Sequence, residues 1–240
     1  MEKIKTDLES LKLPGMTSCL KALEETRRVH ELSFTDGLKL LLQAEQDYRE
    51  EKRYARLLKN ATFRYRASIE ELSFDRARGL EQSAVMNLAS GNFIRNGDSV
   101  LITGQTGCGK SFLASSLGTQ ACRLGFSVAY HNTQKLMVKI KYARLDGSVI
   151  RFFEKLAKTE LLILDDFGLA AMDNQQQLDL LEIIEDRHTV KANSSGNRVL
   201  QSRTRVLTFE EKTYGNERLC ARSGVERSRR LCLDRKFLYK

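Results

Sequence analysis

The chain is poor in the residues that form disulfide frameworks, metal sites and membrane spans. Its 240 residues include one proline, three histidines and five cysteines. The cysteines have no metal-ligand spacing, and Cys108 lies inside a glycine-rich loop, so reduced thiols are expected. No run of eighteen apolar residues is present, and the N-terminus lacks the apolar core of a signal peptide. These absences argue against a zinc module, a secreted disulfide domain and a membrane protein, and predict a cytoplasmic location.

Positive charge is concentrated in the last fifty residues. The net charge is +9, but residues 1–190 carry 27 basic and 26 acidic side chains, whereas residues 191–240 carry 13 and 5. A basic balance favours nucleic acid as a partner. Here the body of the chain is nearly neutral, and the excess lies in the tail.

The most informative motif is a complete G-x-x-x-x-G-K-[ST] phosphate-binding loop. The apolar run 99–103 precedes it as a predicted strand, and residues 110–124 follow as a predicted helix, which is the context that the motif requires. The glycines allow backbone amides to approach phosphate oxygens, Lys110 supplies charge to the β- and γ-phosphates, and Ser111 can bind Mg²⁺. The predicted ATP-binding residues are Gly104, Gln105, Thr106, Gly107, Cys108, Gly109, Lys110 and Ser111.

A second apolar run, residues 161–164, ends in two acids and is typical of a Walker B strand. We expect Asp165 to hold Mg²⁺ together with Ser111, and Asp166 to orient or deprotonate the attacking water. With Lys110, Asp166 completes the predicted catalytic pair. The alternative is an ordinary core strand with solvated acids, which the upstream phosphate loop makes less favourable.

The order of the other elements predicts an α/β fold with a parallel sheet flanked by helices. Strands are expected at 99–103, 127–131 and 161–165, and helices at 133–145, 149–156 and 174–188. Residues 1–75 have leucines at helical spacing, with a break at Pro14 and a helix cap at Thr35 or Asp36. Basic and aromatic residues alternate over residues 49–66. This segment is a candidate DNA or partner surface, and aromatic packing on the core is the alternative for any single residue.

Four segments together resemble the IstB-type ATP-binding proteins, which are AAA+ helpers of insertion-sequence transposition and are similar to DnaC-type helicase loaders. They are Leu11–Met16, Leu101–Ser111, Leu161–Leu169 and Asp179–Arg187. The resemblance spans residues 1 to about 190. It implies an AAA+ P-loop ATPase that uses Mg²⁺ and ATP, forms an ATP-dependent homo-oligomer on double-stranded DNA, and delivers that DNA to a transposase.

One departure from the family pattern and one arginine bear on catalysis. Asp166 stands where most AAA+ proteins have glutamate, although the related loaders share the aspartate. Arg187 follows two acids at a helix end, which favours a surface salt bridge over a trans-acting arginine. The arginine that a neighbouring subunit would contribute cannot be placed in the sequence.

The region after residue 190 departs further. Where the family continues with a buried strand ending in a nucleotide-sensing polar residue, this chain has Lys191–Arg198, which has no strand pattern. Three regions are therefore expected: residues 1–75 as an N-terminal helical region that binds DNA or a partner, 76–190 as the ATPase core, and 191–240 as an aberrant basic tail. Disorder is one expected state of that tail. A shift of reading frame and a divergent DNA-binding tail are the two explanations.

Rival functions remain open at this point. A helicase loader shares every motif, and a catalytically inactive remnant would keep ATP binding without turnover. A small-molecule P-loop kinase would need a lid with paired arginines, and the N-terminal helices and the double-acid strand end argue against it.

Overall fold

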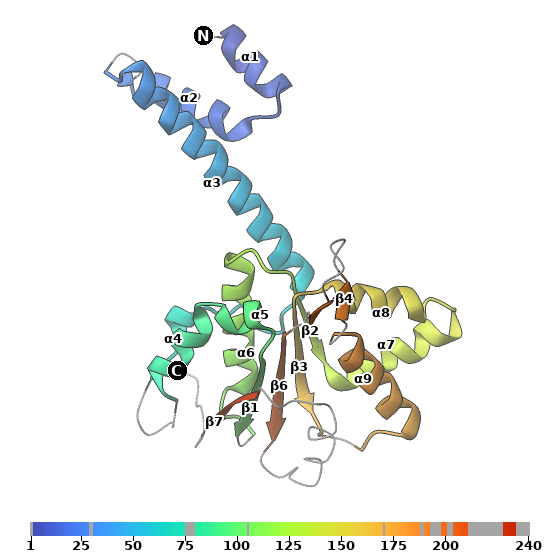
Figure 1. Cartoon of the computed structure of the whole chain (residues 1–240). Coiled ribbons are helices and arrows are strands. Elements are labelled where there is room, and N and C mark those ends of the chain that lie inside the picture. Colours follow the sequence, from blue (N-terminus) through green and yellow to red (C-terminus); the bar gives the residue numbers. More distant parts are fainter. Residues whose placement is uncertain are drawn as a thin grey trace. The chain divides into compact units, whose positions relative to one another are not determined.

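The computed structural model describes residues 2–28, 31–74, 80–104, 106–169 and 171–187, together with the backbone of four strands at 190–192, 198–200, 204–210 and 228–233. The chain divides into two compact units, Met1–Arg56 and Leu57–Lys240 (Figure 1). In the described part of the chain, no helix combines the length and the apolar character needed to cross a bilayer.

The first unit is helical, as predicted. It contains α1 (Glu2–Ser10), α2 (Pro14–Glu25) and most of α3 (Phe34–Ala61). Pro14 occupies the first turn of α2, where its missing N–H costs no hydrogen bond. The buried Glu45 carboxylate of α3 accepts hydrogen bonds from the backbone N–H groups of Gly15 and Met16. The start of α3 differs from expectation, because the hydroxyl of Ser33, not of Thr35, accepts from the Asp36 N–H.

Five parallel strands form the sheet of the second unit, in the order β2-β3-β6-β1-β7. The three strands predicted from apolar runs are confirmed within two residues at each end. Parallel strands buried on both faces are expected to be almost continuously apolar, and β3 fits this with four leading aliphatic residues that have no exposed surface. The strands are β1 (Ser99–Gly104), β2 (Val128–Asn132), β3 (Leu161–Phe167), β6 (Thr204–Glu210) and β7 (Ser228–Leu233).

Helices cover both faces of this sheet, which confirms the predicted layered fold. Leu162 and Leu164 of β3 belong to one apolar core with α7 (Thr133–Leu145), α8 (Val149–Lys158) and α9 (Asn174–Asp186). Ile163, between them, points to the other face and packs beside α6 (Lys110–Arg123). Figure 1 shows α6 on one side of the strands and α7 to α9 on the other. Two shorter helices, α4 (Gln82–Ala89) and α5 (Asn92–Asn96), precede β1.

The division between the units lies nearer the N-terminus than the expected boundary at residue 75. The residues after α3 belong with the second unit because their apolar side chains pack there. Ile69, the first residue of the 3₁₀ helix η2 (Ile69–Glu71), and Leu72, which follows this helix, are both buried. The helix η2 contacts α6. Residues 75–79 themselves lie outside the described part of the chain.

The basic tail contributes backbone strands to the structure. Directly after residue 190, β4 (Val190–Ala192) pairs with β5 (Arg198–Leu200) in a separate antiparallel two-stranded sheet. The position between β1 and β3 is instead taken by β6, twelve residues further on. The sequence of β6, TRVLTFE, contains the β-branched and aromatic residues that favour strands.

Candidate nucleotide site

The phosphate loop joins the carboxyl end of β1 to the first turn of α6. Gly107 and Gly109 have φ values of 81° and 90°, in the left-handed region that favours glycine. A Cβ at Gly107 would meet no atom within 4 Å, so the backbone conformation, and not crowding, requires glycine at this position. Gln105 lies outside the described residues. The other seven residues predicted to bind ATP are brought together in this turn.

Lys110 is held against its own loop. Its Nζ donates a hydrogen bond of 2.9 Å to the carbonyl of Gly104 and lies 3.9 Å from the Sγ of Cys108. Cys108 is fully buried, which agrees with the expected reduced thiol. The ammonium therefore stands within the concave side of the turn, beside the amides that open α6.

The hydroxyl of Ser111 connects the loop to the Walker B strand. It donates a 2.9 Å hydrogen bond to Oδ1 of Asp165, while the hydroxyl of Tyr130 on β2 donates to Oδ2. Asp165 is almost fully buried, with 1% of its surface exposed. Burial, followed by the hydrogen bond to Asp165, raises the pKa of Tyr130 well above its usual value. Tyr130 therefore stays protonated and fixes the carboxylate.

A β-bulge lets two successive acids serve one site. Side chains alternate between the faces of a regular strand, so Asp165 and Asp166 would normally diverge. Here β3 shifts register against β6 between Leu164 and Phe167, and Asp166 adopts a left-handed φ of 53°. Aspartate is among the few non-glycine residues that tolerate this conformation, which offers a physical reason for aspartate in place of glutamate.

Asp166 is contacted by side chains from different parts of the second unit. The side-chain amide of Asn132, at the end of β2, donates to Oδ2 over 2.7 Å. The Arg64 guanidinium lies 3.4 Å from the same oxygen and 3.8 Å from Oδ2 of Asp165. The sequence predicted no role for Asn132, and it placed Arg64 in the candidate DNA or partner surface of residues 49–66 and not in the nucleotide site.

The segment after α3 reaches this site because it packs on α6. A Cβ at Gly118 would lie 2.4 Å from the ring of Phe63 and 2.8 Å from Ile163, so glycine alone leaves room for the ring. Phe63 also meets Tyr130 edge to face, with ring centroids 6.0 Å apart, and Tyr65 packs against Phe112. For these two aromatics, packing on the core is confirmed. In the sequence, Gly118 within the helix predicted at 110–124 is the one sign that another side chain could pack closely there.

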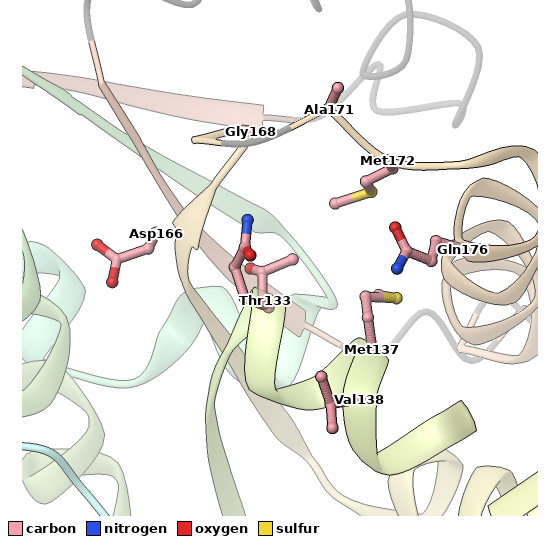
Figure 2. A pocket seen from close by; sticks show the side chains of 9 residues that line it. Thr133, Met137, Val138, Asp166, Gly168, Ala171, Met172 and Gln176 are labelled. Carbon is pink, nitrogen blue, oxygen red and sulfur yellow. The ribbon is translucent and has the colours of Figure 1, made fainter. Parts of the chain in front are cut away.

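A small pocket lies on the other side of Asp166. It is about 120 Å³, whereas ligand pockets usually measure roughly 300–1,000 Å³. Figure 2 shows the Asp166 carboxylate pointing away from the side chains of Met137, Met172 and Gln176, which line the pocket. The pocket therefore adjoins the site at Asp166, on the side away from its carboxylate.

Arg187 corrects the expectation of a surface salt bridge. Its side chain is fully buried and donates to the carbonyls of Leu156, Thr159 and Glu160, at the end of α8 and the start of β3. These contacts also make it unsuitable as an arginine offered to a neighbouring subunit. An ion pair on α9 is made by the buried Asp179 with Arg144 of α7.

The oxygen atoms at which the phosphate loop meets β3 are suitable ligands for a magnesium ion. Mg²⁺ prefers hard oxygen ligands and usually keeps waters and substrate phosphates in its shell, so one hydroxyl and one carboxylate suffice from the protein. Ser111 and Asp165 present this pair. Within the described ranges, no cluster of three or more His, Cys, Asp or Glu side chains is placed to hold a metal.

Comparison with known proteins agrees with this geometry. The family model described as IstB-like ATP binding protein matches residues 6–214. A relative from insertion sequence IS1162 of Pseudomonas fluorescens, named for ATP binding, is 43% identical over 183 residues, covering 76% of this chain and 79% of its own. A Sinorhizobium fredii insertion-sequence relative is 37% identical over 181 residues, covering 75% of this chain and 74% of its own.

Solved structures show the same fold at low identity. AMPPCP-bound DnaA from Aquifex aeolicus has a TM-score of 0.57 at 18% identity and covers 71% of this chain; the match spans about half (51%) of the DnaA chain. The DnaC helicase loader has a TM-score of 0.53 at 17% identity, covering 70% of this chain and 97% of its own. The fold is therefore a P-loop fold of AAA+ type.

Proposed function

Because this chain belongs to the family of IstB-like ATP binding proteins, we propose that it is an ATP-binding helper of DNA transposition. It binds DNA in the cytoplasm and uses Mg²⁺-ATP binding and hydrolysis to assemble or activate the transposase of its element. The observation that carries the nucleotide chemistry is the 2.9 Å contact between Ser111 of the phosphate loop and Asp165 of the Walker B strand. It joins the two halves of an ATPase site.

Catalysis in this proposal depends on positioning and electrostatics. The loop amides and Lys110 neutralise charge on the β- and γ-phosphates, while Ser111 and Asp165 hold Mg²⁺, which would polarise the phosphoryl oxygens. Asp166, supported by Asn132, aligns the attacking water. An arginine from a neighbouring subunit in an ATP-dependent homo-oligomer completes the charge neutralisation.

The first unit offers a surface for the DNA backbone. Arg49, Lys52, Arg53 and Arg56 are exposed and follow helical spacing along one face of α3. Acidic Asp47, Glu50 and Glu51 fall on the opposite side by the same spacing. This arrangement supports non-specific contact with double-stranded DNA through phosphates.

Salt dependence tests this surface. Each phosphate contact to duplex DNA contributes roughly 0.9 to the slope of log affinity against log salt. In the triple variant Lys52→Ala/Arg53→Ala/Arg56→Ala, the magnitude of this slope, measured by fluorescence anisotropy, should therefore decrease by up to about 3. Glu51→Ala, on the opposite face, serves as the control. A triple variant with the wild-type slope would show that these α3 side chains do not contact DNA phosphates.

A helicase loader is the second candidate, and the structural likeness to DnaC supports it at the level of fold. The sequence relatives come from insertion sequences, which favours the transposase as partner. Pull-down of the full chain with the transposase of its element or with a replicative helicase separates the two. A catalytically inactive, frameshifted remnant is the third candidate, and it predicts nucleotide binding without turnover.

A DNA-stimulated ATPase assay on the full chain tests the central proposal. We expect phosphate release that depends on Mg²⁺ and rises with duplex DNA. Lys110→Ala should abolish binding of a fluorescent ATP analogue. If Lys110→Ala still binds the analogue, the site assignment is contradicted. If the wild type binds the analogue but releases no phosphate, the catalytically inactive remnant is supported.

The divergent tail has its own test. We infer that the coding sequence changes frame in the region after residue 190, because the charge changes there and residues 191–198 lack the strand pattern that the resemblance implies, although the family model extends to residue 214. Translation of the other two frames downstream should then yield, in one of them, the buried strand ending in a polar residue that the family resemblance implies, which has the form T-I-I-A-S. If neither frame encodes such a strand, the tail is a divergent basic segment.

A further inference from the structure

Arg64 is held in place by its neighbours on both sides. The ring of Phe63 fills the space over Gly118, and Tyr65 packs on Phe112 with ring centroids 6.4 Å apart. Thr62, which precedes them, has a φ of 54°, an unusual value for a β-branched residue that turns the chain sharply out of α3. The backbone at residue 64 is therefore anchored beside the nucleotide site.

The guanidinium of Arg64 reaches the two carboxylates that the nucleotide site needs for its cation and its water. It lies 3.4 Å from Oδ2 of Asp166 and 3.8 Å from Oδ2 of Asp165. Half of the Arg64 side chain, 51%, is exposed, whereas Asp165 is buried. A positive charge at this position weakens the attraction of both acids for any other cation.

We propose that Arg64 is a built-in competitor for the divalent cation and sets the cation concentration at which the nucleotide site fills. The inference rests on the proposed function, since it assigns Asp165 to the cation. For the cation to enter, the guanidinium must leave the carboxylates. Its exposure allows that movement, and the guanidinium already lies over the face of Tyr65, with the ring centroid 5.4 Å from Arg64 Cζ, a cation–π contact that it can keep as it leaves the carboxylates.

Titration with Mn²⁺ alone, followed by electron paramagnetic resonance of the free ion, tests the competition without nucleotide. Arg64→Gln should bind Mn²⁺ about two- to fivefold more tightly than the wild type, the range expected for partly exposed ion pairs. Arg66→Gln makes the same charge change two residues away. Arg66 forms no hydrogen bond or ion pair with any described residue, so this control should leave the Mn²⁺ affinity unchanged. Asp165→Asn should abolish the difference between Arg64→Gln and the wild type.

A second arm measures binding of a fluorescent ATP analogue at increasing Mg²⁺. The Mg²⁺ concentration that gives half-maximal binding of the analogue, the Mg²⁺ midpoint, should be lower in Arg64→Gln than in the wild type and unchanged in Arg66→Gln. Equal Mn²⁺ affinities of wild type and Arg64→Gln, or a higher Mg²⁺ midpoint in Arg64→Gln, overturn the inference. Failure of the wild type to bind the analogue overturns the proposed function instead, and the nucleotide-free Mn²⁺ arm still decides the role of Arg64.

Discussion

Gly118 provides a test of how the segment after α3 is fixed to the ATPase core. The substitution Gly118→Ala would place a methyl group 2.4 Å from the Phe63 ring and 2.8 Å from Ile163. Ile163 is fully buried in the central sheet and has little room to move. Overpacking of a core costs about 1–3 kcal/mol, and replacing glycine by alanine inside a helix recovers about 0.5–1 kcal/mol. We therefore expect a net loss of about 1–2 kcal/mol in the free energy of unfolding.

Thermal unfolding followed by circular dichroism measures this loss. For a unit of this size, the midpoint should fall by about 2–8 °C. Gly37→Ala is the matched control, because a Cβ at this α3 position meets no atom within 4 Å. The control should be neutral or stabilising, by up to about 1 kcal/mol.

A double-mutant cycle identifies the cause. Phe63→Ala removes the ring that the new methyl group meets, so Gly118→Ala should cost less in that background than in the wild type. A Gly118→Ala protein that unfolds at or above the wild-type midpoint would refute the packing of Phe63 on α6.

Three further substitutions test the site and its supports. Asp166→Asn keeps a residue that tolerates a φ of 53°, so ATP binding should persist while phosphate release falls by about 10²-fold or more; equal rates would contradict the role of Asp166. Burial, with Lys139 and Lys155 nearby, lowers the pKa of His131 from 6.5 to about 4. The unfolded chain therefore binds the proton more readily, and the stability that His131 supports above pH 6.5 declines as pH falls toward 4; the urea midpoint of His131→Gln should decline less over this interval. Arg187→Met leaves three carbonyls without their donor and should cost about 2–4 kcal/mol in urea unfolding, whereas an unchanged midpoint would contradict this role.

The phosphate loop and its flanking elements could be predicted because their signals are local. The glycines, Lys110 and Ser111 lie within eight residues, and the apolar runs of β1 and β3 mark buried parallel strands without further information. Their convergence followed from the rule that the carboxyl ends of parallel strands meet at one edge of a sheet.

The features that sequence reasoning missed depend on contacts between distant residues. Arg64 and Asp166 are 102 positions apart, and nothing near Arg64 in the sequence identifies an acidic partner. For Arg187 the local signal was misleading, because the preceding acids suggested an ion pair while the acceptors are backbone carbonyls about thirty residues earlier. The bulge at Asp165–Asp166 needs the register of the neighbouring strand, which no pattern in β3 reveals.

The buried Arg187 also bears on how this chain tolerates a change in its later sequence. Its guanidinium donates to carbonyls of residues 156, 159 and 160, so these contacts between the end of α9 and the α8–β3 connection are made by residues up to 187. What the later residues must supply to the central sheet is a strand between β1 and β3 and another at the outer edge of β1. Backbone pairing makes modest demands on side chains, so a sequence of unrelated origin can meet that need if it contains short β-forming runs. The contacts of Arg187 therefore lie upstream of the segment whose contribution to the central sheet is backbone pairing by β6 and β7.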